Sequence, residues 1–161
     1  HEDVQLIVAG DGPDREKLEA MVQAMMIPNV TFLGYVSDEV KMELLQNADL
    51  FCAPAVYGES FGIILLEAMA CGLVTVAGDN SGYVSVMTDT GAISLVDPQN
   101  TASFSRRLKL LLYEDGMRRD WQKWAKQNVK QYDYVNIIDQ YENLYKHSLK
   151  NHSHHVHAYE E

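Results

Sequence analysis

The chain has 161 residues, of which 47% are hydrophobic, enough to bury the core of one globular domain. Its formal net charge is −10, from 23 acidic and 13 basic residues. This balance excludes non-specific binding to nucleic acid, which depends on clustered lysine and arginine. It also argues against this part of a protein being the main anchor on an anionic membrane.

The cysteines indicate the cellular setting. Cys52 and Cys71 each lie in an apolar run, so we expect two small buried hydrophobic residues rather than a disulfide. A reducing, cytoplasmic location follows. No apolar stretch approaches the roughly 20 residues that span a bilayer. The chain opens on His1 without a signal peptide or an initiator methionine, so we expect a fragment of a longer protein.

Short β-branched runs alternate with amphipathic stretches, which predicts an α/β fold with a Rossmann-like parallel sheet flanked by helices. The predicted strands are Val4–Ala9, Val30–Leu33, Asp49–Ala53, Val74–Ala77 and Ala92–Val96.

Helices are expected between and after these strands. Pro13 is placed at the first helical position after the turn Gly10-Asp11-Gly12, and Ser37 or Asp38 can cap the second helix. Gly72 is expected to end the third. The other predicted helices are Gly62–Cys71, Ser81–Met87, 101–113, 116–131 and 134–148.

One domain is therefore predicted over 1–148, followed by a mobile tail over 149–161. The tail is rich in histidine, a composition that binds metal adventitiously, but no other ligand set accompanies it and we expect no designed metal site. Its histidines are His152, His154, His155 and His157.

The stretch most informative about function runs from Gly58 to Gly72. Glu67 lies in an apolar segment, where a carboxylate is costly unless it is hydrogen-bonded or faces a cleft. The start of this helix offers free backbone N–H groups to an anion, and it follows a parallel strand, where ligands bind. Glu59 and Glu67 near such a site favour sugar or ribose hydroxyls as partners. The alternative interpretation, a capped core helix whose one glutamate reaches the surface, remains open.

Glu59 and Glu67 are separated by seven residues, and their stretch resembles the E-x7-E motif of retaining GT-B glycosyltransferases of family 4. Three further segments are similar to that family's glycine-rich turn, V-x-F-L-G strand and strand before the motif. Among its subfamilies the chain looks most like the phosphatidylinositol mannosyltransferases. The three segments are Gly10–Pro13, Val30–Gly34 and Ala48–Pro54.

The resemblance implies a role for each matching residue. Glu67 would accept hydrogen bonds from the donor ribose, and Glu59, as the candidate catalytic residue, would hold the transferred sugar and steady positive charge at its anomeric carbon. The backbone N–H groups of Phe61, Gly62 and Ile63, after Ser60, would contact the sugar and the diphosphate. Gly10 and Gly12 in the glycine turn would let the chain pass near the donor. Tyr35 and Val36, in the loop after the second strand, would border the base.

The resemblance also implies what lies outside this chain. The family binds the donor diphosphate with an arginine and a lysine on an earlier unit. Arg15 and Lys17 do not match that spacing and are expected to be solvated helix residues. We expect the chain to be a C-terminal GT-B half-domain that lacks its first strand and the N-terminal acceptor domain. We expect this half-domain to be inactive alone. Its open sheet edge invites a homodimer.

The implied reaction moves a hexose from a GDP- or UDP-sugar to a lipid or saccharide hydroxyl, with GDP-mannose favoured and no cofactor or metal required. Contact with the inner membrane face would come through the other half. A non-catalytic α/β nucleotide-binding or interaction domain and a sugar-nucleotide epimerase remain as alternatives. A nicotinamide site is excluded because Arg15 stands where the third glycine belongs.

Overall fold

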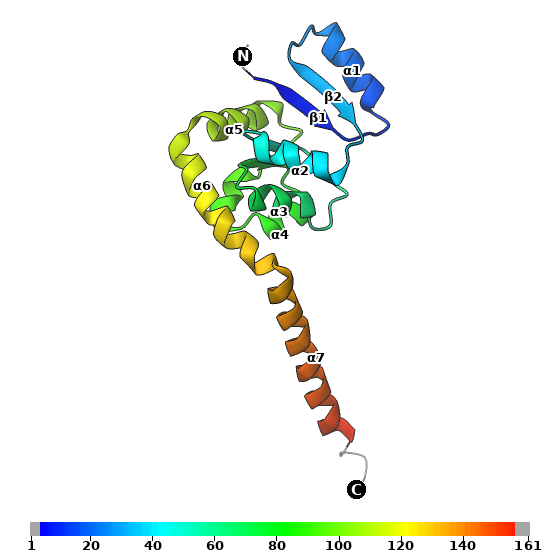
Figure 1. Cartoon of the computed structure of the whole chain (residues 1–161), viewed down its shortest axis with the longest axis vertical. Helices are drawn as coiled ribbons and strands as arrows, with labels where there is room; N and C mark the ends of the chain where they lie inside the picture. The colour runs from blue at the N-terminus through cyan, green and yellow to red at the C-terminus, as the bar shows by residue number, and fades with distance from the viewer. Residues whose placement is uncertain (1–3, 157–161) are drawn as a thin grey trace. The chain divides into compact units, whose positions relative to one another are not determined.

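The computed structural model describes the backbone of residues 4–156 and the side chains of residues 4–149. The chain divides into two compact units, His1–Asn47 and Ala48–Glu161. Both are built from parallel strands and helices, as predicted (Figure 1). A single donor domain over 1–148 remains a prediction.

The first unit has the order β1 (Leu6–Ala9), α1 (Arg15–Ala24), β2 (Val30–Gly34) and α2 (Asp38–Asn47). Strands β1 and β2 are parallel, with Leu6 opposite Val30. The amide of Gly10, at φ 127°, donates to the carbonyl of Gly34 over 2.7 Å, which ties the carboxyl ends of the two strands together.

Helix starts in this unit differ slightly from the prediction. Helix α1 begins at Arg15 after an Asp14 cap, two positions beyond Pro13, because the turn continues past the proline. Ser37 caps α2 as predicted, its Oγ accepting from the amide of Val40 at 3.4 Å.

The second unit begins with β3 (Phe51–Ala53), α3 (Ile63–Ala70), β4 (Thr75–Ala77) and α4 (Ser81–Val86). Strands β3 and β4 are parallel and in register from Phe51 opposite Thr75 to Ala53 opposite Ala77. Gly72 ends α3 as predicted: it has φ 69°, and the amides of Gly72 and Leu73 donate to Met69 and Ala68 over 2.9 Å.

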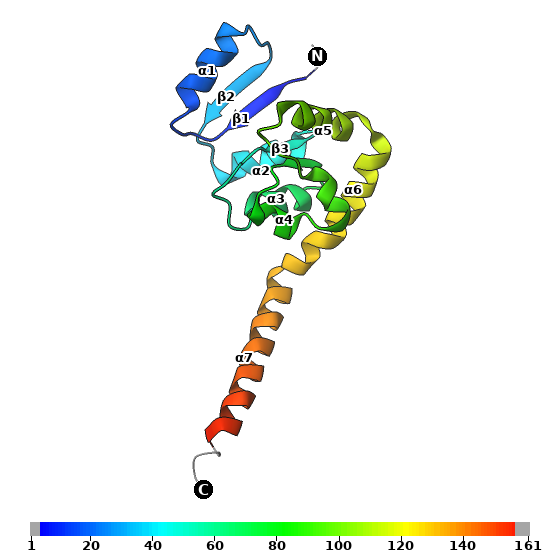
Figure 2. The same ribbon diagram turned by 180° about the vertical axis from the view of Figure 1, so that it is seen from behind.

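The remainder of the second unit is helical (Figure 2). Its elements are η1 (Asp89–Ser94), α5 (Thr101–Tyr113), α6 (Asp115–Asn128), η2 (Val129–Tyr132) and α7 (Tyr134–Val156). Helix α7 continues past 148, so the predicted tail is helical backbone as far as Val156. His157 lies outside the described residues.

The predicted strand Ala92–Val96 is wrong. These residues form the end of η1 and one parallel bridge from Leu95 to Ala77. Gly91 lies against the ring of Trp124, and Ser94 accepts a 2.7 Å hydrogen bond from Trp121. Packing against α6 therefore decides the conformation of a short apolar run that has no periodicity of its own.

The predicted single sheet also differs from what is found, since the described residues form two separate two-stranded sheets. The hydrophobic core lies in the second unit, around β4 and α3, and is closed by Trp121 and Ala125 of α6. Cys52 and Cys71 are free thiols and half-buried. Burial raises the pKa of Cys52 to about 11.

Candidate nucleotide-sugar site

The loop between β3 and α3 carries the first group of predicted site residues. Glu59 is half-buried, whereas Ser60, Phe61 and Ile63 are exposed. Gly62 is buried and has φ 92°, a left-handed conformation that a side chain would strain. Helix α3 begins directly after it, so its first backbone N–H groups lie beside the exposed part of this loop.

Glu67 lies in the second turn of α3 and is half-buried. Burial, and secondarily the charge of the Glu67 carboxylate, raises the pKa of Cys71 one helical turn later. Because Glu67 is only half-buried, the free-energy cost expected for a carboxylate in an apolar helix is reduced.

A second loop, after β4, and the first residues of α4 hold the loop that carries Glu59 in place. The side-chain amide of Asn80 donates to the carbonyl of Ala55 over 3.0 Å. A Cβ on Gly78 would lie 2.1 Å from that same carbonyl oxygen, and a Cβ on Gly82 would lie 2.3 Å from the carbonyl oxygen of Glu59. Only glycines at 78 and 82 permit these two backbone approaches.

Because β3 and β4 are parallel neighbours, both loops leave the same edge of the sheet, which is where α/β proteins bind ligands. The edge offers one half-buried carboxylate, the start of a helix and exposed backbone. This arrangement suits an uncharged polyol next to an anion.

Sequence reasoning missed the residues of this second loop and of the start of α4. Gly78, Asn80 and Gly82 follow a predicted strand directly, and a glycine-asparagine cluster at the carboxyl end of a parallel strand is the signal that could have identified them. Tyr83, which is buried beneath Gly62, gave no such signal.

The remaining predicted site residues lie in the first unit. The turn with Gly10 and Gly12 and the loop with Tyr35 and Val36 follow β1 and β2 and are brought together at one end of that sheet by the Gly10–Gly34 hydrogen bond. Tyr35 is 87% exposed and Val36 is half-buried. Their contact with a donor remains a prediction.

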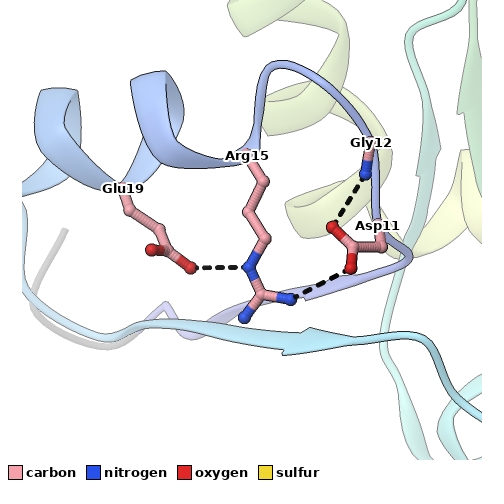
Figure 3. A network of polar contacts seen from close by, with 4 residues as sticks. All are labelled: Asp11, Gly12, Arg15 and Glu19. Carbon is pink, nitrogen blue, oxygen red and sulfur yellow. Dashed lines mark hydrogen bonds and ion pairs between the residues drawn. The ribbon is translucent and has the colours of Figure 1, made fainter.

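Arg15 lies in α1 with a partly exposed side chain, as expected, and also makes two ion pairs. Figure 3 shows its guanidinium between Asp11 and Glu19, with Nε 2.8 Å from the Glu19 carboxylate and Nη1 3.8 Å from that of Asp11. The hydrogen bond to Glu19 raises the pKa of Arg15. The Asp11 carboxylate also accepts from the amide of Gly12 at 2.9 Å. Arg15 thus fixes the glycine turn.

No group of three or more metal-ligating side chains is present among the described residues. No helix within that part of the chain is long and apolar enough to cross a membrane.

Comparison with known proteins identifies the family of the chain. A family model described as "Glycosyl transferases group 1" matches residues 1–128. The phosphatidyl-myo-inositol mannosyltransferase of Mycobacterium leprae is 34% identical over 145 residues, which are 90% of this chain and 38% of that protein. The chain thus spans well under half the length of this relative.

Solved structures are similar as well, two of which illustrate the range. The catalytic domain of cholesterol-α-glucosyltransferase from Helicobacter pylori has a TM-score of 0.70 at 26% identity, covering 81% of this chain and 80% of that one. Anabaena HepE in complex with UDP-glucose has a TM-score of 0.73 at 23% identity, covering 91% and 42%, and shows the fold alone. The chain belongs to the glycosyl transferases group 1 family and shares the α/β architecture of GT-B glycosyltransferases.

Proposed function

We propose that this chain is the donor-binding part of a retaining glycosyltransferase that moves a hexose from a nucleoside diphosphate sugar to a lipid or saccharide hydroxyl. The observation that carries the proposal is the single sheet edge at which Glu59 and the start of α3 lie together, with Glu67 in the helix that follows. Membership of the group 1 family supports it.

In the proposed reaction, the bond between the anomeric carbon and the diphosphate oxygen breaks. A bond from the acceptor hydroxyl oxygen forms on the same face of the sugar, and the acceptor proton passes to the departing diphosphate oxygen. The Glu59 carboxylate holds the sugar hydroxyls and stabilises positive charge at the anomeric carbon. Amides at the start of α3 stabilise negative charge on the departing diphosphate. Glu67 binds the ribose hydroxyls.

The donor we favour is GDP-mannose, because the M. leprae relative is named as a mannosyltransferase. A UDP-sugar is the second candidate, supported by the UDP-glucose complex of a protein with the same fold. We expect no metal or cofactor to be required. The acceptor would be bound by the remaining part of a longer protein, which we expect to work in the cytoplasm, at the membrane surface. We expect this chain alone to be inactive in transfer.

Calorimetric titration with GDP, UDP and their mannose and glucose conjugates tests the proposal. Binding of one nucleotide class is expected. Glu67→Ala should weaken it by about 1–3 kcal/mol, the value of two lost hydroxyl contacts. Glu142→Ala is the matched control, since Glu142 is exposed in α7, where its carboxylate pairs with Lys146. Equal affinities of wild type and Glu67→Ala, with the fold intact, would remove Glu67 from the site.

A further inference from the structure

The start of α3 is the anion-binding part of the proposed site. Helix α3 begins at Ile63, and its N-cap is Gly62, which has no side chain to accept from the first N–H groups of the helix. The direction of those N–H groups, and of the N–H group of Phe61, therefore depends on the backbone of the loop before the helix. This loop, residues 54–62, is the Glu59 loop. Its backbone needs contacts from other elements to be held in one conformation.

Phe61 in this loop is held by two elements that follow it much later in the chain. Its ring and the ring of Tyr132 in η2 have centroids 5.6 Å apart and planes at 75°, an edge-to-face arrangement. On the backbone side, a Cβ on Gly82 of α4 would lie 3.0 Å from the nitrogen of Phe61. The Phe61 side chain is 38% exposed and Tyr132 is half-buried, so the aromatic contact lies at the surface, beside the N–H groups of the loop.

Tyr132 is carried by a segment that is itself fixed to the core of the second unit. The side-chain amide of Asn128, at the end of α6, donates to the carbonyl of Val86 in α4 over 3.2 Å. Val129, the first residue of η2, packs against the hydrophobic core. Because η2 has only four residues, little chain separates this anchor from Tyr132. The ring of Tyr132 is therefore presented from a fixed position, and Phe61 packs on it.

We propose that Tyr132 is a positioning residue for the donor diphosphate: its ring holds the ring of Phe61, so that the N–H groups of Phe61, Gly62 and the first turn of α3 face the diphosphate. This inference rests on the proposed function. The backbone of a loop loses conformational freedom when an anion binds to its N–H groups, and a contact made beforehand reduces that loss. The effect concerns the diphosphate and leaves the ribose, which is assigned to Glu67, unaffected.

Tyr132→Ala tests this directly, because it removes the ring that contacts Phe61. The measured quantity is the dissociation constant of the nucleoside divided by that of its diphosphate, determined by NMR titration. The probes are guanosine with GDP, or uridine with UDP, according to the class that the wild type binds. Tyr132→Ala should lower this ratio about three- to tenfold, as for the loss of an edge-to-face aromatic pair. The affinity for the nucleoside should not change.

Two variants serve as controls. Tyr132→Phe keeps the ring and should retain the wild-type ratio, whereas a role for the hydroxyl would lower it and overturn the inference. Tyr134→Ala removes a tyrosine ring at the start of α7 that is 79% exposed, and it should leave the ratio unchanged. A ratio that falls equally in Tyr134→Ala and Tyr132→Ala would overturn the inference.

A double-mutant cycle identifies the partner of Tyr132. In a Phe61→Leu background, Tyr132→Ala should not lower the ratio further, because the ring that it holds is already gone. Additive effects of the two substitutions would overturn the inference. So would an unchanged ratio in Tyr132→Ala, or an equal loss of affinity for the nucleoside and its diphosphate, which is the result of a general loosening of the domain.

Two further outcomes complete the test. If Tyr132→Ala does not fold, Phe61→Leu replaces it, because the Phe61 side chain is partly exposed and is not part of the core. Phe61→Leu should lower the ratio by a similar factor, and an unchanged ratio would overturn the inference. A wild-type chain that binds neither GDP nor UDP would overturn the proposed function itself, a result distinct from an unchanged ratio.

Discussion

The two compact units hold their ligand-facing loops by different means. In the second unit the Glu59 loop lies on a hydrophobic core that includes Leu65, Val76 and Trp121, none of which is exposed. In the described part of the first unit only Gly34 and Leu45 are buried, and the glycine turn is held by the polar contacts of Arg15. Packing thus fixes one loop, and a partly exposed ion pair fixes the other.

The difference has an energetic consequence. Buried apolar contacts contribute several kcal/mol per large side chain, whereas exposed ion pairs contribute about 1 kcal/mol or less. We therefore expect the second unit to carry most of the stability, and substitutions to rank by their distance from its core.

The largest effect is expected for Trp121→Ala. Trp121 has no exposed surface, and its indole N–H donates to Ser94. Its removal should leave a cavity and an unpaired hydroxyl, and should cost about 3–5 kcal/mol in the free energy of unfolding. Urea denaturation measures this. Met26→Ala, at a side chain 85% exposed in the first unit, should change stability little. Similar losses for the two variants would contradict the comparison.

Gly82→Ala should have the next largest effect. The added methyl would meet the carbonyl oxygen of Glu59, so the loop or α4 must shift, at a cost of about 1–3 kcal/mol. Nucleotide-sugar affinity should fall with it. Gly116→Ala in α6 is the control, because a Cβ there meets no atom within 4 Å. Thermal melts of both variants check the difference, and equal melting temperatures would refute it.

Alkaline pH should also weaken the second unit. Tyr83 is held neutral in the folded state, with a pKa of about 12, against about 10 for an unfolded tyrosine. Its stabilising contribution is complete below pH 10 and is lost as pH rises from 10 to 12, because the unfolded state releases the proton first. The unfolding free energy measured across this range should fall less steeply for Tyr83→Phe than for wild type. Parallel curves would contradict the burial of its hydroxyl.

The smallest effect is expected for Arg15→Ala, since the Arg15 side chain is 33% exposed and its partners more so. The hydrogen-exchange rate of the Gly12 amide should nevertheless rise, because Asp11 would lose its ion pair with Arg15 and the turn would be held less firmly. Lys123→Ala, which breaks the exposed pair with Asp120, is the control. Unaltered exchange at Gly12 would show that the turn does not need Arg15.

Periodicity in the sequence was sufficient for much of the fold. Helix α5 was predicted over 101–113 and is found at Thr101–Tyr113, because its apolar residues recur at helical spacing and Asn100 caps it. The parallel α/β class, the Gly72 helix end and the glutamates of the E-x7-E motif were likewise read from local pattern. Each depends on neighbours in the chain.

Tertiary structure decided what local pattern left open. The run Ala92–Val96 became a 3-10 helix and a bridge because two tryptophans of α6 contact it, Trp124 at the preceding Gly91 and Trp121 at Ser94. Tyr83 came to lie under Gly62, and Gly82 came to lie against the backbone carbonyl oxygen of Glu59. These outcomes depend on contacts between residues far apart in sequence. The residue types that carry the proposed chemistry were evident from the sequence, but the side chains that orient them were set by packing.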